Sequence, residues 1–183
     1  MEKDFEMEIY SEEKSDKQLL GDCEGNGVCV YMDNRVYTLL EEYARSNTDK
    51  ELGAMLLGSY LKKNGKINVL VDSFIEAKFT EASAARLTFT HKTWQWVHEE
   101  RERKYPTKKI VGWQHTHPGY GVFLSKYDMF IHENFFDLPF QIAYVIDPVH
   151  KKRGFFGWQN GQVEPLKGFY MCKAKKSPAE KEN

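Results

Sequence analysis

The chain of 183 residues has few cysteines and no long hydrophobic run. Its cysteines are Cys23, Cys29 and Cys172, an odd number without a CxxC pair, which argues against a complete disulfide framework. We expect them to be reduced and mainly structural. No stretch approaches the roughly 18 apolar residues that a membrane-spanning helix requires, so we expect no membrane partner.

The chain also lacks an excess of either charge. Its 26 basic and 27 acidic residues give a net charge of -1, and neither sign forms a stripe, so no nucleic-acid partner is expected. Residues 1–18 are acidic and polar without an apolar segment, unlike a signal peptide. We therefore expect a cytoplasmic protein.

Apolar residues make up 41% of the chain and aromatic residues 14%, enough for one well-buried core. The chain is too short for two ordinary domains. We expect a flexible acidic N-terminus over 1–20, one folded domain over 21–172 and a flexible charged tail over 173–183.

Hydrophobic spacing and capping residues predict three helices. Asp33 is a capping residue before apolar positions that repeat at helical spacing, Thr90 precedes a helix reaching about Lys104, and Ser125 begins a third.

Strands are predicted over 28–32, 52–61, 67–74, 109–115, 140–146 and 154–158. Asn64-Gly65 is a strong hairpin signal between the second and third of these. The order of elements predicts an α/β fold with a mixed β-sheet wrapped by helices.

The most informative segment is Gly112–Asp128, which reads GWQHTHPGYGVFLSKYD. Side chains two apart on a strand point to the same face, so His115 and His117 can present two imidazoles to one ion. Asp128 can return a carboxylate from the first turn of the following helix. Two imidazoles and one carboxylate suit Zn²⁺, and three protein ligands are typical of a catalytic zinc site.

These residues also have structural interpretations. A pair of histidines on a strand can be surface or core residues, and Ser125 with Asp128 forms an S-x-x-D pattern that by itself indicates helix capping. Other zinc signatures fail, because His98 and His132 lack the second histidine of H-E-x-x-H and the chain has no P-C-x-x-C pair.

With its His-x-His-Pro core and Ser-x-x-Asp ending, this segment resembles the JAMM motif of the MPN-plus metallopeptidases. It is close to the version in the catalytic subunits of the proteasome lid and the signalosome. Glu51, at the head of an apolar strand, matches the upstream glutamate of the family, and Ile146-Asp147-Pro148 continues the likeness. The short chain resembles compact prokaryotic members.

The resemblance implies a single MPN (JAMM) domain with cytidine-deaminase-like layering. It also implies one Zn²⁺ per chain, held by His115, His117 and Asp128. Glu51 would take a proton from water and deliver it to the leaving amine, and Ser125 would donate a hydrogen bond to the oxyanion.

The implied activity is that of a JAMM zinc isopeptidase, similar to deubiquitinases. It would cleave after the C-terminal glycine of ubiquitin or a ubiquitin-like protein, in deconjugation or precursor processing. One alternative is a metallohydrolase of the same fold that processes a sulfur carrier or a small substrate. Another is a non-catalytic MPN scaffold. A neighbouring gene for an E1-like or E2-like enzyme would favour deconjugation.

The expected partner is thus a ubiquitin-like protein and its conjugates. Its extended tail would add to an exposed strand beside the zinc site. Phe79, Phe123 and Phe130 are candidates for gripping the modifier, although core packing is the role that the sequence favours for each.

Overall fold

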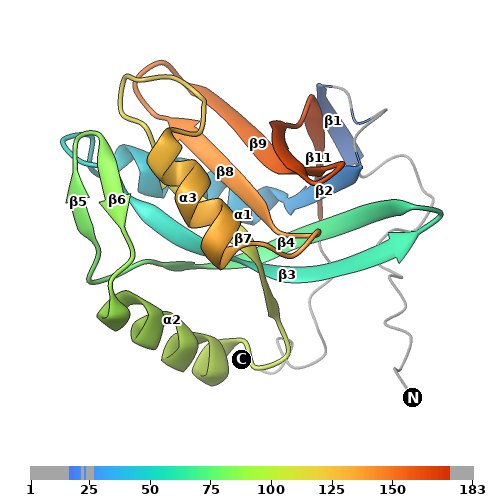
Figure 1. The fold of residues 1–183 in the computed structure, drawn as a ribbon, viewed down its shortest axis with the longest axis horizontal. Helices are drawn as coiled ribbons and strands as arrows, with labels where there is room; N and C mark the ends of the chain where they lie inside the picture. The colour runs from blue at the N-terminus through green and yellow to red at the C-terminus, as the bar shows by residue number, and fades with distance from the viewer. Residues whose placement is uncertain (1–16, 22, 24–26, 174–183) are drawn as a thin grey trace.

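A computed structural model describes residues 17–21, 23 and 27–173. Within them the chain forms three helices, a nine-stranded sheet and a separate two-stranded sheet (Figure 1). The helices are α1 (Asn34–Arg45), α2 (His91–Lys104) and α3 (Lys126–Phe135). The strands are β1 (Lys17–Gly21), β2 (Val28–Asp33), β3 (Gly53–Lys63), β4 (Lys66–Glu76), β5 (Glu81–Ser83), β6 (Arg86–Thr88), β7 (Lys109–Thr116), β8 (Ile142–Asp147), β9 (Lys152–Gln159), β10 (Gln162–Pro165) and β11 (Gly168–Cys172).

The large sheet is mixed, with strand order β1-β11-β2-β4-β3-β7-β8-β9-β10. β2 runs parallel to β4 and to β11, β7 runs parallel to β8, and the other neighbours are antiparallel. Helix α3 lies in the connection between β7 and β8. A parallel pair needs such a crossover, since a tight hairpin can join only antiparallel strands. The crossover begins at the carboxyl end of β7, where the segment with the two histidines lies.

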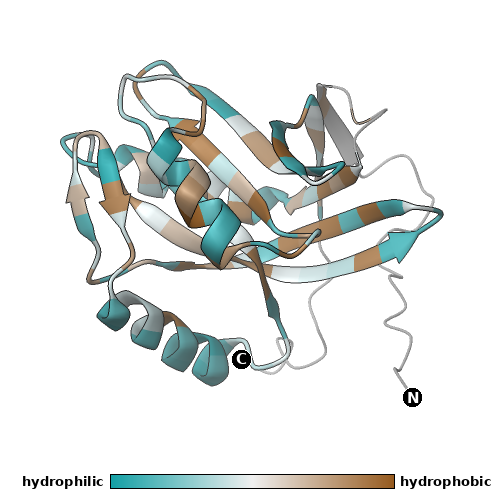
Figure 2. Cartoon of the chain, in the orientation of Figure 1, coloured by the Kyte–Doolittle hydropathy of each residue, from teal (hydrophilic) through white to brown (hydrophobic). Residues whose placement is uncertain are grey.

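The sheet is buried on both faces. Val36, Leu40 and Ala44 of α1 pack into one hydrophobic cluster, whereas Val97 of α2 and Ile131 of α3 belong to a second. Figure 1 shows α1 and α3 on opposite sides of the sheet. Hydrophobic residues concentrate in the central strands, and hydrophilic residues follow α2 and the tip of the β3–β4 hairpin (Figure 2). This layering confirms the expected α/β fold with a mixed sheet wrapped by helices.

The three predicted helices are present, and their caps are the predicted residues. Asp33 accepts hydrogen bonds from the backbone amides of Arg35 and Val36, while Thr90 and Ser125 each form a capping box. All six predicted strands are present as well, with ends shifted by at most two residues. The β3–β4 turn has positive φ angles at Asn64 and Gly65, as the hairpin signal requires.

Five short strands were not predicted: β1, β5, β6, β10 and β11. β1 pairs with β11, so residues 17–20 of the expected flexible N-terminus lie in a sheet and the folded unit starts before residue 21. Residues 1–16 and 174–183, the rest of the two predicted flexible ends, lie outside the described residues.

No helix in the described part of the chain is long and apolar enough to cross a membrane. Cys23, Cys29 and Cys172 are all buried, and the structure forms no disulfide among these three described residues. Burial of all three agrees with the structural role expected for them.

Candidate metal centre

The pairing of β3 with β7 brings Glu51 beside the two histidines. Gly53 pairs with His115 in this antiparallel register. Continuing the register by two residues, just before β3 and just after β7, places Glu51 opposite His117. The amide of Thr116 donates to the carbonyl of Leu52 at 2.9 Å, so the pairing continues past the end of β3. Because positions two apart share a face, the three side chains point to one side of the sheet.

The N-terminus of α3 supplies a carboxylate to the same place. Ser125 is the N-cap, and its Oγ accepts a hydrogen bond from the backbone amide of Asp128 at 3.1 Å. Oδ2 of Asp128 accepts from the amide of Ser125 at 2.7 Å, which completes a capping box. The cap fixes the direction of the Asp128 side chain, so the S-x-x-D pattern serves both the helix and the site.

Three side chains converge on one point. Nε2 of His115 lies 3.0 Å from Nε2 of His117, and the Asp128 oxygens lie 3.5 and 3.3 Å from these two nitrogens. All three residues are buried, at 3% exposure or less. Donor atoms about 2.0–2.1 Å from a tetrahedral zinc ion lie roughly 3.3 Å from one another. The donor set and its spacing therefore fit Zn²⁺.

The carboxylate of Glu51 borders this cluster. Its Oε1 lies 3.9 Å from Nε2 of His117, and its Oε2 is buried without a hydrogen-bond partner among the described residues. A buried carboxylate oxygen normally has a partner, so its isolation indicates a position meant for water or substrate. Four of the five predicted site residues thus surround one point, and the fifth, Ser125, caps the helix that carries Asp128.

Burial and charge oppose each other in this cluster. Burial lowers the pKa of His115, which favours the neutral imidazole that a metal needs. Burial also acts to lower the pKa of His117, but the hydrogen bond and the charge of Asp128 outweigh it, so the pKa of His117 is raised. Burial acts to raise the pKa of Asp128, but hydrogen bonds from both histidines hold this pKa well below its usual range.

Glu51 differs from Asp128, although both are buried carboxylates. Burial raises the pKa of Glu51 to about 7, against the opposing charge of His117 and with a further contribution from Asp128. A carboxyl group with a pKa near neutrality can both accept and return a proton at neutral pH. Two neighbouring carboxylates with pKa values pushed apart are typical of sites that perform acid–base chemistry.

An aromatic wall supports the histidines. The indole of Trp113 stacks on the ring of His115, with centroids 4.4 Å apart, and its Nε1 donates to Nδ1 of His132 at 3.0 Å. His132 is fully buried. Trp113 was not among the predicted site residues, although it stands two positions before His115 and therefore on the same face of the strand.

Gln114 stands between Trp113 and His115 in the sequence and is also buried. Its side chain lies on the other face of β7, since successive side chains on a strand alternate.

Asp147 is a further residue that sequence analysis did not assign to the site. It is fully buried at the end of β8, and it accepts hydrogen bonds from the amides of Gly119 and Gly121 in the loop after His117. The sequence signal that could have assigned Asp147 to the site was its position in Ile146-Asp147-Pro148, at the end of an apolar strand.

The three phenylalanines considered for modifier binding are all exposed. Phe79, Phe123 and Phe130 have exposed fractions of 58%, 45% and 55%. The prediction that they pack in the core is therefore wrong for each. Phe123 contacts the ring of His117, with centroids 4.7 Å apart, and is therefore the one nearest the site.

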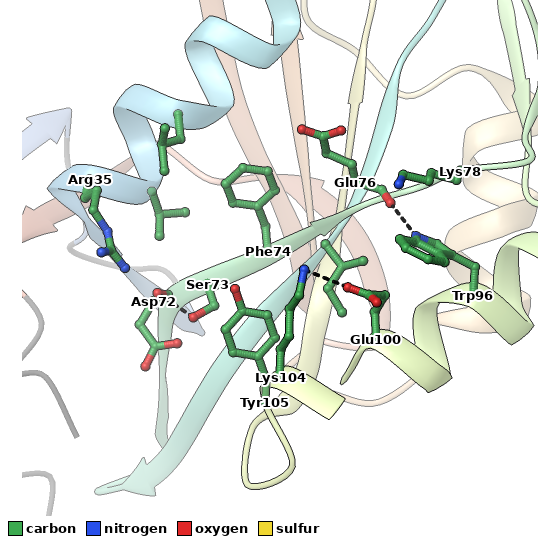
Figure 3. A pocket seen from close by; sticks show the side chains of 13 residues that line it. Arg35, Asp72, Ser73, Phe74, Glu76, Lys78, Trp96, Glu100, Lys104 and Tyr105 are labelled. Atoms are coloured by element: carbon green, nitrogen blue, oxygen red, sulfur yellow. Dashed lines mark hydrogen bonds and ion pairs between the residues drawn. The ribbon is translucent and has the colours of Figure 1, made fainter. Parts of the chain in front are cut away.

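A separate pocket of about 370 Å³ lies between α1, β4 and α2 (Figure 3). None of the five predicted site residues lines it. Its wall contains ionic groups of both signs, and some of these pair within the protein, such as Lys104 with Glu100 at 2.8 Å.

Comparison with known proteins places the site within a matched region. Residues 27–138 match the family model described as "JAB1/Mov34/MPN/PAD-1 ubiquitin protease". This range contains all five predicted site residues and more than half of the chain.

Three curated relatives have informative names. The chain is 32% identical over 104 residues to the NAD(+) hydrolase TcpA of Theionarchaea archaeon (strain DG-70-1), covering 52% of this chain and 32% of that protein. It is 25% identical over 130 residues to the 26S proteasome regulatory subunit rpn11 of Schizosaccharomyces pombe, covering 70% and 41%. It is 33% identical to COP9 signalosome complex subunit 5 of Candida glabrata over 94 residues, covering 48% and 19%. The match thus spans less than half the length of each relative.

A solved structure has the same fold at low sequence identity. The protein DSY2949 from Desulfitobacterium hafniense superposes with a TM-score of 0.59 at 13% identity, covering 84% of this chain and 99% of that one.

Proposed function

Because the chain belongs to the JAB1/Mov34/MPN/PAD-1 ubiquitin protease family, we propose that it is a zinc-dependent isopeptidase or peptidase. In this proposal it cleaves the amide bond after the C-terminal glycine of ubiquitin or a ubiquitin-like protein. The observation that carries the proposal is the convergence of two imidazoles and a carboxylate on one buried point, with a second carboxylate 3.9 Å from one imidazole.

His115, His117 and Asp128 would hold the metal through the atoms that converge. When bound there, Zn²⁺ supplies Lewis-acid chemistry, polarising the substrate carbonyl and making a water proton acidic near neutral pH. A site that only stabilised the fold would use four protein ligands, whereas these three ligands leave a position for a reactant. The intact ligand set argues against the alternative of a non-catalytic scaffold.

Glu51 would act as general base and then general acid. Its unpartnered Oε2 can accept the proton of the attacking water, and with a pKa raised to about 7 it can then give that proton to the departing amine. The departing nitrogen needs this proton because an amide anion is a poor leaving group.

Ser125 would stabilise the oxyanion. Its Oγ accepts from the Asp128 amide at 3.1 Å, and its hydroxyl also gives the Asp128 carboxylate a hydrogen bond that lowers the pKa of that group. In the reaction the hydroxyl would donate its proton to the oxyanion. A preorganised donor of this kind contributes on the order of 3 kcal/mol to transition-state stabilisation.

The β5–β6 hairpin offers a surface for an extended tail. The amide of Glu51 donates a hydrogen bond to the carbonyl of Ser83 at 2.8 Å, so the hairpin is held next to the proposed base. An extended peptide can add to a strand edge through main-chain hydrogen bonds. The exposed ring of Phe123 would then contact the globular part of the modifier.

The test uses ubiquitin-like modifiers with a fluorophore joined by an amide to the terminal glycine. We expect zinc-loaded protein to release the fluorophore and chelator-treated protein to be inactive. His115→Ala should lose both zinc, measured by elemental analysis, and activity. His98→Ala, which changes an exposed histidine on α2, is the control and should lose neither. Stoichiometric zinc retained by His115→Ala would rule out the ligand assignment.

A second candidate is a hydrolase of a small substrate, favoured by the similarity to a protein named as an NAD(+) hydrolase. Incubation with NAD⁺, followed by chromatography, separates the two candidates. Consumption of NAD⁺ that His115→Ala abolishes, together with intact modifiers, would replace the isopeptidase proposal by this one.

A further inference from the structure

Asp147 is the centre of a hydrogen-bond network beside the proposed metal centre. Its Oδ1 accepts from the amides of Gly119 at 2.9 Å, Val149 at 3.0 Å and His150 at 3.1 Å. Its Oδ2 accepts from the amide of Gly121 at 2.8 Å and from Nδ1 of His150 at 2.7 Å. Five donors therefore surround one carboxylate that has no exposed surface.

This network joins two separate segments. The bonds from Val149 and His150 would suffice to stabilise the turn between β8 and β9, as an aspartate commonly does at the start of a turn. The bonds from Gly119 and Gly121 come from residues 28 and 26 positions away, and the turn does not need them. Asp147 therefore has a second role in the loop that follows His117.

The two glycines give the loop its direction. Gly119 and Gly121 have φ angles of +81° and +87°, in the left-handed region where glycine is favoured, and nothing lies within 4 Å of an added Cβ at either. The backbone conformation, rather than a lack of space, thus explains the glycines at positions 119 and 121. This conformation turns both amides toward the carboxylate of Asp147.

Gly121 also contacts a proposed metal ligand. Its carbonyl oxygen lies 3.2 Å from Nδ1 of His117. A carbonyl can only accept, so Nδ1 carries the proton and Nε2 keeps its lone pair. Nε2 is the atom that faces His115 and Asp128.

We propose that Asp147 is a positioning residue of the metal centre, acting through Gly121 on His117. By fixing the Gly121 amide, it keeps the Gly121 carbonyl on Nδ1 of His117 and so holds the ring in the tautomer and orientation that binds metal. Partners of this kind behind a ligating histidine strongly affect metal affinity. The inference deepens the proposed function and rests on it.

The charge of Asp147 is stable in this environment. Burial by itself acts to raise its pKa, but the hydrogen bonds from His150 and from the two glycine amides hold the pKa well below the usual range. The network therefore contains an ionised acceptor, and ionised acceptors form stronger hydrogen bonds than neutral ones.

Asp147→Asn tests the inference, since the side chain keeps one carbonyl oxygen for the turn but has an NH₂ group in place of the other oxygen. With Oδ1 on the turn amides, the new NH₂ group faces the donors Gly121 and His150. We expect zinc affinity, measured by competition with a fluorescent chelator, to fall about 10- to 100-fold. Long-range ¹H–¹⁵N spectra should show that metal-free His117 loses its preference for the proton on Nδ1.

Glu41→Gln is the matched control for Asp147→Asn. Glu41 is a buried carboxylate that pairs with Arg153 at 2.6 Å and does not contact the loop. This variant should lose stability but keep zinc affinity and the His117 tautomer. An equal loss of affinity in both variants would overturn the inference, because the effect would then follow from reduced stability alone.

A second pair of variants applies if Asp147→Asn does not fold. Gly121→Ala and Gly65→Ala both place a Cβ in open space at a positive φ, so their conformational cost is similar. Only Gly121→Ala should weaken zinc binding, because Gly65 lies in the distant β3–β4 turn. Unchanged affinity in Gly121→Ala would contradict the inference, whereas a wild-type protein that binds no zinc would contradict the proposed function itself.

Discussion

At the scale of single residues, Glu51→Gln separates proton transfer from metal binding. The substitution keeps the size and hydrogen-bonding capacity of the side chain but removes the base. Because Glu51 is not among the three converging ligands, the variant should keep its zinc and still bind substrate. Turnover should fall by about 10²- to 10⁴-fold, the usual cost of losing an acid–base group.

The measurement for Glu51→Gln is single-turnover cleavage of a fluorogenic modifier by protein shown to be zinc-loaded. Glu76→Gln, at the exposed end of β4, is the control for loss of a carboxylate elsewhere. A zinc-loaded Glu51→Gln protein with turnover close to that of the wild type would exclude Glu51 as the proton carrier.

Most of the candidate site could be predicted at this scale. The spacing of His115, His117 and Asp128 suggested a shared ligand set, and the family resemblance, now confirmed, pointed to Glu51. Asp147 could not be assigned, because its role depends on a loop returning to it from 26 and 28 residues earlier in the chain. Sequence spacing does not reveal such a contact.

At the scale of elements, the N-terminus of α3 combines a structural and a chemical role. Ser125→Ala removes the cap of the helix, which costs about 1 kcal/mol of stability. It also removes the proposed oxyanion donor, so turnover should fall by about 10²- to 10³-fold. Both effects are measurable in one preparation, by thermal unfolding and by cleavage of a fluorogenic modifier.

Asp33→Ala is the control for Ser125→Ala, because it removes the cap of α1 on the opposite face of the sheet. It should lower stability by a similar amount and leave turnover of the folded protein unchanged. Turnover is compared at measured zinc content, because the Ser125 cap also orients Asp128. If both zinc-loaded variants lost turnover equally, reduced stability alone would explain the effect and Ser125 would have no role as a donor.

The long elements were predictable and the short ones were not. β3 and β4 have 11 residues each, long enough for apolar patterning and an Asn-Gly turn to define them. β5 and β6 have only three residues each, too few for alternation to be recognised. Their strand conformation depends on tertiary contacts, such as the bond from the Glu51 amide to Ser83.

At the scale of the whole molecule, the site lies where the two cores and the crossover meet. β7 contributes Val111 to the cluster under α1 and Trp113 to the cluster under α2 and α3. The strand that carries His115 is therefore fixed from both faces. A rigid support of this kind preorganises the ligands, so the metal site depends on the stability of the entire sheet.

This dependence gives a pH effect on stability that can be assigned to His132. Nδ1 of His132 accepts a hydrogen bond from Nε1 of Trp113, which requires the neutral ring. Burial lowers the pKa of His132 to about 4, from an ordinary value of 6.5. Between these values the unfolded chain binds more protons than the folded one, so the free energy of unfolding falls as the pH decreases.

We expect His132 to contribute its full stabilisation above about pH 6.5 and to lose it progressively toward pH 4, by an amount on the order of 3 kcal/mol. His132→Gln keeps an acceptor for Trp113 but cannot titrate, so its unfolding free energy should depend less steeply on pH over this interval. Urea unfolding of both proteins with a chelator present excludes the effect of metal release. Because His115 and His117 remain in both, parallel pH profiles would show that His132 does not titrate between the two states.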